Sequence, residues 1–297
     1  MKRGLILSVL MVLVFCFSLP FAAAEEDAKT VTFGTCSVAS DAVRIDLGMQ
    51  RVEDWDSFIE FLHQLPQLEQ VDMFATVVEE KEINRLKNAF PDVKFGWTIS
   101  FAKGKHQIRT DATAFSTLHG SCSRHTSEDF SVLQYCTELK GLDLGHNDIT
   151  DLSFLENLTE LRVLILADNA RLGGDPKYRG IDKIGKLTKL EYLELFSCNL
   201  VDISWMENLT HLIDLNFAQN NVLDCSVLVN LKQLKRLYLW QRNWAYRQLD
   251  LPSKLPHTFI MNNKKPTANN WRSGPHYEIV HEMFQTGTYI PFADSYE

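Results

Sequence analysis

The sequence predicts an α/β fold, a right-handed solenoid with a parallel concave sheet, and its repeats are the main evidence. One pattern recurs five times: leucine, two residues, leucine (phenylalanine once in the third position), one residue, leucine. The copies begin at Leu139, Leu161, Leu190, Leu212 and Leu234, in steps of 22, 29, 22 and 22 residues. Each copy is followed by a polar or cysteine position: Asn147, Asn169, Cys198, Asn220 and Arg242. Such a step is typical of stacked units that each contain one short strand and one return arc.

The return arcs are the second observation, because they also repeat. Segments 149–155, 200–206 and 222–228 share an Asp-x-Ser core. These arcs are too short for a long helix, so we expect 3₁₀ or irregular turns there. Asp151, Asp202 and Asp224 are expected to accept hydrogen bonds from backbone amides at the start of each arc. Units of this kind are leucine-rich repeats.

The N-terminal part predicts longer, helical arcs. Alternating apolar residues over 43–47, 68–73 and 93–97 indicate strands. Between them, 55–62 and 83–90 have apolar residues at helical spacing, and Pro66 and Pro91 follow these segments. Residues 100–130 are polar and rich in Thr, Ser, His and Gly, which predicts a long loop that interrupts the stack.

The chain therefore divides into four predicted parts. Residues 1–24 form a signal peptide, 25–130 an N-terminal cap with diverged repeats and the long loop, 131–265 the regular repeats, and 266–297 a C-terminal cap. One further step from Leu234 places Phe259 and Met261 at the strand positions of a last unit. A helix over 277–284 is expected to cover the end of the stack, because an open solenoid end exposes apolar core.

The first residues predict export. Lys2 and Arg3 precede an apolar run over 5–17, and Ala22, Ala23 and Ala24 follow it, which is typical of a cleaved secretory leader. The alternatives are an uncleaved anchor and a lipid anchor on Cys16. The run is shorter than a membrane span, and bulky Phe15 disfavours lipidation. We expect a secreted or cell-envelope protein with no membrane span after cleavage.

The charge of the chain limits the classes of partner that it is expected to bind. The chain has 30 basic and 38 acidic residues, and losing the leader makes it more acidic. Such a charge opposes nucleic-acid binding and favours cationic partners.

After the leader, five cysteines remain. Cys198 and Cys225 fall at packing positions of their repeats, and a bridge between Cys122 and Cys136 stays open as an alternative.

The repeat unit beginning Leu139-Lys-Gly-Leu142-Asp-Leu144-Gly-His-Asn147 resembles the short repeat of bacterial internalins. More closely, the chain resembles secreted leucine-rich-repeat proteins of Gram-positive anaerobes. Two segments carry this likeness: Arg-Thr-Asp-Ala-Thr over 109–113, before the repeats, and Trp-Arg-x-x-Pro-x-Tyr over 271–277, after them. The resemblance implies an extracellular or envelope binding role and supplies no ligand.

The residues between the repeat leucines should point out from the concave sheet and form a ligand-binding face. This predicted face combines carboxylates with aromatic side chains: Asp143, Tyr192, Glu194, Phe196, Asp214, Asn216, Arg236, Tyr238 and Trp240. Exposed aromatics favour protein interfaces, so we expect a protein or peptide partner. The alternatives are a solvated face without a partner, and a carbohydrate or cell-wall glycan that stacks on the aromatics.

The other motifs are weak. His119, Cys122 and His125 are spaced like zinc ligands but lack an evident fourth ligand, and the Gly/Pro-rich insertion over 173–180 matches no calcium loop. No nucleophile elbow, phosphate loop or dinucleotide fingerprint occurs. The sequence therefore predicts no enzyme activity, no metal and no cofactor.

Overall fold

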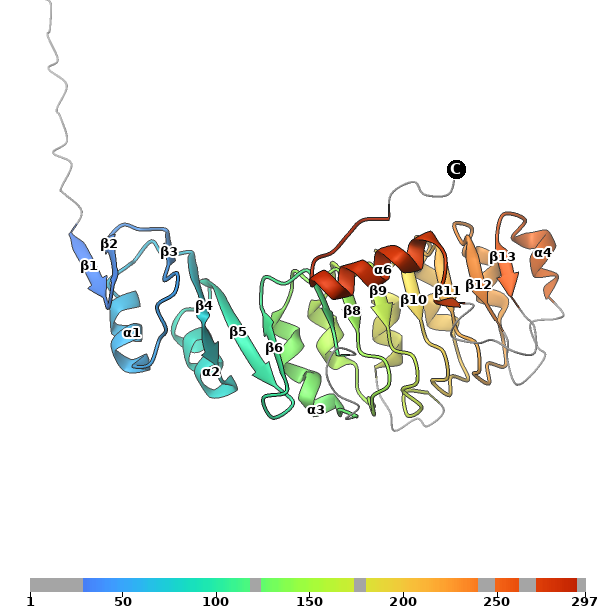
Figure 1. Ribbon diagram of the computed structural model, residues 1–297, viewed down its shortest axis with the longest axis horizontal. Coiled ribbons are helices and arrows are strands. Elements are labelled where there is room, and N and C mark those ends of the chain that lie inside the picture. Colours follow the sequence, from blue (N-terminus) through green and yellow to red (C-terminus); the bar gives the residue numbers. More distant parts are fainter. Residues whose placement is uncertain (1–28, 118–123, 174–179, 240–248, 262–270, 293–297) are drawn as a thin grey trace, which may run out of the picture.

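A computed structural model describes residues 29–117, 124–173, 180–239, 249–261 and 271–292. Its strands form a hairpin, a four-stranded sheet and a seven-stranded sheet along an elongated molecule (Figure 1). The signal peptide, the insertion over 174–179, Trp240 and the zinc candidates His119 and Cys122 lie outside the described residues.

The N-terminal part begins with the antiparallel hairpin β1 (Thr30–Phe33) and β2 (Cys36–Ala39). In the four-stranded sheet, β3 (Arg44–Asp46), β4 (Gln70–Val78) and β5 (Lys94–Phe101) run parallel, and β6 (His106–Arg109) pairs antiparallel with β5. The helices α1 (Trp55–Leu62) and α2 (Glu80–Ala89) lie where the periodicity predicts them. Asp54 caps α1 by accepting from the backbone N–H of Ser57 at 3.1 Å.

The regular repeats build the seven-stranded parallel sheet. Its strands are β7 (Ala114–Ser116), β8 (Gly141–Asp143), β9 (Val163–Ile165), β10 (Tyr192–Glu194), β11 (Asp214–Asn216), β12 (Arg236–Tyr238) and β13 (Phe259–Met261). The return arcs are α3 (Ser127–Phe130) with η1 (Ser131–Tyr135), then η2 (Ser153–Asn157), η3 (Ile181–Lys186), η4 (Ser204–Asn208), η5 (Ser226–Asn230) and α4 (Leu251–Lys254). The predicted solenoid, with helical N-terminal arcs and mainly 3₁₀ C-terminal arcs, is confirmed.

One leucine from each of five repeats forms a continuous spine. These residues face one another in register and are fully buried: Leu142, Leu164, Leu193, Leu215 and Leu237. Successive turns therefore bury a shared core that no single turn could form alone.

Asparagine recurs at the same position of several repeats, and its buried side-chain amide forms hydrogen bonds between neighbouring turns. Asn169 donates to the carbonyl oxygens of Leu144 and Leu166, both at 2.9 Å, so it bonds two successive turns. Asn220 accepts from the backbone N–H of Cys198 and of Leu200. Where the third unit has cysteine, its Sγ lies 3.1 Å from the carbonyl oxygen of Leu166 and fills the same buried position.

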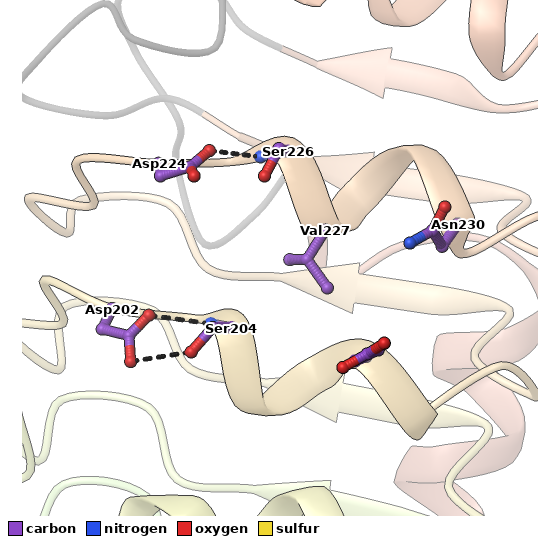
Figure 2. Close-up of a pocket in the computed structure, with 7 residues that line it drawn as sticks. Asp202, Ser204, Asp224, Ser226, Val227 and Asn230 are labelled. Carbon is purple, nitrogen blue, oxygen red and sulfur yellow. Dashed lines mark hydrogen bonds between the residues drawn. The ribbon is translucent and has the colours of Figure 1, made fainter.

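The aspartates at the start of the arcs cap them as expected. Asp202 Oδ1 accepts from the backbone N–H of Ser204 at 2.9 Å, and Asp224 Oδ1 accepts from Ser226 at 2.8 Å (Figure 2). Asp151 and Ser153 make the same bond at 2.8 Å. The hydrogen bonds from the backbone and side chain of Ser226 lower the pKa of Asp224. A pocket lies between the successive arcs η4 and η5, and its lining includes Asp202, Ser204, Asp224 and Ser226 (Figure 2).

Two expectations are wrong in detail. The segment 100–130 is not one irregular loop, because β5 reaches Phe101 and β6, β7 and α3 follow. Phe101, Ile108 and Ala114 are buried there, so its apolar residues build strands despite the polar composition. The last unit is also offset by one residue: Leu237 pairs with Ile260, which turns Phe259 outward.

The C-terminal helix α6 (Pro275–Thr286) contains the predicted segment 277–284, but it does not cover the end of the stack. It crosses the concave side of the seven-stranded sheet and contacts β7 and β8 (Figure 1). The reason is that the sheet has an apolar outer face, which requires a cover.

Candidate functional site

Residues 271–292, here called the strap, pack on the concave face of the seven-stranded sheet. A second hydrophobic core lies between the strap and the sheet and is separate from the core inside the solenoid. The sheet contributes Ala114, Val163, Ile165, Ala167, Tyr192, Ala218 and Tyr238, and the strap contributes Trp271, Val280, Met283 and Phe284. The concave face of these repeats is therefore occupied by the chain itself.

Trp271 is the anchor of the strap at its N-terminal end. Its ring lies 5.4 Å from the ring of Tyr192 and 4.9 Å from that of Tyr238, and its indole Nε1 donates to Glu194 Oε2 at 2.9 Å. The guanidinium carbon of Arg236 is 4.5 Å from its ring centre. A buried tryptophan that satisfies its N–H in this way fixes both position and orientation.

An ion pair and a close histidine contact lie at the same end of the strap. Arg236 donates two hydrogen bonds to Asp214 Oδ2, at 2.9 and 2.5 Å, and a third to the carbonyl oxygen of Ser273 at 2.9 Å. His276 Nδ1 of α6 lies 3.2 Å from the same Asp214 oxygen. Asp214 and His276 are almost fully buried, so these pairs are shielded from solvent.

Burial also changes the acidity of the central carboxylates. Desolvation raises the pKa of Glu194 to about 7, although the Arg272 side chain and the Trp271 N–H partly oppose this. Burial likewise raises the pKa of Asp143, whose Oδ1 accepts from the backbone N–H of Gly145 at 3.0 Å. Burial therefore favours the protonated form of both carboxyl groups.

The other end of the strap lies over the first strands. A side-chain carbon added at Gly141 of β8 would come within 2.6 Å of Met283 Sδ, so glycine permits the close approach of α6. After α6, the backbone N–H of Tyr289 donates to Thr113 Oγ1 at 2.9 Å, and the Phe292 ring lies 6.3 Å from that of Tyr192.

The nine predicted site residues are brought together in part, but their expected exposure is wrong. Six are buried beneath the strap or in hydrogen bonds of the sheet: Asp143, Tyr192, Glu194, Asp214, Asn216 and Tyr238. Phe196 and Arg236 are partly buried, and Trp240 is outside the described residues. The physical reason is that outward-facing Val163 and Ile165 join the aromatics in one apolar surface. These two residues are the sequence signal that should have predicted a cover.

The four-stranded sheet presents a different face. Its outward residues, here called the open face, are charged or polar around one aromatic ring: Arg44, Asp46, Gln70, Asp72, Phe74, Thr98 and Arg109. Arg44 Nε donates to Asp72 Oδ2 at 3.1 Å. The guanidinium carbon of Arg109 lies 3.9 Å from the centre of the Phe74 ring. The main strand contacts of the strap helix are with β7 and β8 of the other sheet.

The metal and cysteine candidates that lie in the described residues, His125, Cys136, Cys198 and Cys225, take ordinary structural roles. His125 Nε2 lies 3.0 Å from His106 Nε2 in a buried pair, and burial lowers the pKa of His106. Across the described ranges, no three His, Cys, Asp or Glu side chains form a group that could hold a metal. Cys136 is a buried free thiol whose pKa is raised to about 12 by burial, and Cys198 and Cys225 are buried as expected. Of the residues that the structure describes, none forms a helix of the length and apolar character that a membrane span requires.

Comparisons with known proteins agree with the repeat architecture. Residues 137–174 match the family model described as leucine-rich repeats (2 copies). Internalin C2 from Listeria monocytogenes is 19% identical, with 76% of this chain and 85% of that chain covered and a TM-score of 0.37. An internalin (inlF) from the same species is 19% identical over 77% of this chain and 70% of that chain, with a TM-score of 0.33.

A leucine-rich-repeat protein from Leptospira interrogans is 20% identical over 75% of this chain and 55% of that chain, with a TM-score of 0.39. A comparison with curated proteins found no match. At these identities and TM-scores, the solved structures support no statement about the role or partners of this chain. The chain therefore has a leucine-rich-repeat fold, as its own stacked parallel strands and the match over residues 137–174 show.

Proposed function

We propose that this chain is an exported binding module for a protein or peptide, and that the partner contacts the open face of the four-stranded sheet. The observation that carries this proposal is that the outer face of one sheet is covered by the chain itself, whereas the outer face of the other is exposed. The strap buries the outer face of the seven-stranded sheet, whereas Arg44, Asp46 and Arg109 remain exposed on the neighbouring sheet.

The chemistry of the open face suits a protein partner. Arginine and aromatic residues are enriched at protein interfaces because they bury large areas and donate several hydrogen bonds. The guanidinium of Arg109 lies over the Phe74 ring and is also paired with Asp111 at 2.7 Å, so it is held in place before a partner arrives. Preorganisation of this kind reduces the entropy lost on binding.

Direct contact of a partner with the buried concave residues is less favourable, because the strap would first have to leave. Removing Trp271 from its site would expose an aromatic core and break the Arg236–Asp214–His276 contacts. Loss of one large buried aromatic side chain alone costs about 3–5 kcal/mol. A glycan would face the same cost before stacking on Tyr192 or Tyr238.

The test is capture of extracellular proteins from the organism's surroundings by the mature chain. Phe74→Ala and Arg109→Ala should each reduce capture of the same partner at least tenfold. Arg124→Ala is the matched control, because Arg124 is also an exposed arginine paired with aspartates, but lies beside the regular repeats. Equal capture by the wild type and all three variants would exclude the open face as the contact surface.

A further inference from the structure

A pocket of about 350 Å³ lies beside the open face, at the junction of the two sheets. It is bounded by the first half of β5, by α2 and the turn after it, and by η1 with the residues that follow it, and its lining includes Lys87, Phe95, Trp97, Thr110, Asp111 and Tyr135. The pocket exists because the parallel ladder is interrupted here. Strand β6 pairs with β5 from Thr98 to Phe101, so among the described strands none pairs with residues 94–96 on that side.

Two residues that line the pocket carry donors without a hydrogen-bond partner among the described residues. The indole Nε1 of Trp97 is buried and has no hydrogen-bond partner in the described structure. The Lys87 ammonium lies 4.2 Å from the centre of the Tyr135 ring, and burial lowers its pKa. Within the part of the chain that the structure describes, no carboxylate lies within ion-pair distance of Lys87. An unsatisfied buried donor costs about 1–3 kcal/mol, so a ligand acceptor here would recover that cost.

The carboxylates of the lining are already neutralised. Asp72 pairs with Arg44, Asp111 with Arg109, and Glu138 with Lys94 at 2.8 Å. The ammonium of Lys87 is therefore the excess charge of this site. Tyr135 neighbours both residues, since its ring centre is also 6.3 Å from that of Trp97. The site accordingly attracts an anion that also accepts a hydrogen bond.

The edge of β5 adds a backbone element. Thr110 N donates to the carbonyl oxygen of Trp97 at 2.9 Å, and Trp97 N donates to Thr110 Oγ1 at 3.1 Å, so the backbone of Trp97 faces this side. Alternate residues of a strand direct their backbone groups to the same side. The N–H and C=O of Phe95 therefore face the pocket, where an extended peptide could pair with them.

We propose that this pocket binds the C-terminal carboxylate of an extended peptide. The carboxylate accepts from Trp97 Nε1 and pairs with Lys87, the peptide backbone pairs with Phe95, and the last side chain packs among Pro91, Val93 and Tyr135. This inference rests on the proposed function and names the part of the partner that is recognised.

The experiment uses the mature chain labelled with ¹⁵N-tryptophan and the probes N-acetylphenylalanine and N-acetylleucine. Their C-terminal amides are the control ligands. The indole signal that disappears in Trp97→Phe should shift saturably with the acids, with a Kd on the order of 1 mM, which is typical of so small a ligand. The amides should bind at least tenfold more weakly, because they carry no negative charge.

Lys87→Gln should weaken the acids by a similar factor. Lys81→Gln is the matched control and should bind like the wild type. Lys81 is an exposed lysine of the same helix, as Lys87 is, but it is paired with Glu82 and does not line the pocket. No shift of the Trp97 signal, equal shifts with acids and amides, or full binding by Lys87→Gln would each overturn the inference. If capture of a partner still depends on Phe74 in that case, the proposed function stands without this pocket.

Discussion

The two sheets of this molecule are built from the same alternation of inward and outward strand residues, but only the seven-stranded sheet is covered by the strap. In both, alternate strand residues point into the solenoid core, as Val71 and Leu193 do. On the outer side, the seven-stranded sheet presents Val163, Ile165 and Tyr192, which pack beneath the strap. The four-stranded sheet presents paired charges instead and stays open. The outward residues, rather than the leucines, decide whether a solenoid face becomes a second core or a contact surface.

The largest expected effect on stability comes from removing Trp271, which anchors the strap to the seven-stranded sheet. Trp271→Ala should lower the free energy of unfolding by about 3–5 kcal/mol, because it removes a buried aromatic and leaves Glu194 without its indole donor. Phe74→Ala on the open face should cost less than about 1.5 kcal/mol, since Phe74 is only partly buried. Urea unfolding of both variants measures the difference. Similar losses would mean that the strap adds little stability.

A matched pair of glycine substitutions sharpens the contrast. Gly141→Ala should destabilise by about 1–3 kcal/mol and loosen α6, because the new methyl group meets the enclosed Met283. Gly96→Ala places a methyl group 2.5 Å from the edge of the Phe74 ring, which can turn toward solvent, so its cost should stay below about 1 kcal/mol. Limited proteolysis of the C-terminal residues, together with thermal unfolding, tests the pair. Equal proteolysis of both variants would contradict this assignment.

The last prediction concerns the dependence of stability on pH. Burial raises the pKa of Glu194 from about 4.5 in the unfolded chain to about 7 in the folded chain. Between these values the folded state keeps a proton that the unfolded state loses, so the free energy of unfolding falls as pH rises through this window. Glu194→Gln should flatten the fall between pH 5 and 7.5 by about 1–3 kcal/mol.

Denaturant unfolding across this pH range measures the effect. Exposed Glu128→Gln controls for the loss of one negative charge. An unchanged slope in Glu194→Gln would show that this carboxylate does not carry the pH dependence.

The features that sequence could predict are those carried by local spacing. The leucine step gave the register of Leu142 to Leu237, and the Asp-x-Ser arcs gave the caps at Asp202 and Asp224. The strap position depends instead on contacts between distant residues: Trp271 and Glu194 are 77 positions apart. Periodicity within a strand shows which residues point outward, but it does not show whether a later segment returns to cover them.

A strap fastened at both ends also fixes the number of repeat units between its two attachment points. Trp271 is held on β10 and β12, while Tyr289 is held beside β7 by Thr113. The twelve residues of α6 extend for about 18 Å, and each inserted unit would lengthen the sheet by about 4.8 Å. Gain or loss of a single unit between these anchors would bring Met283 out of line with Gly141. Open solenoids can evolve by duplicating turns, whereas this one must change its C-terminal helix at the same time.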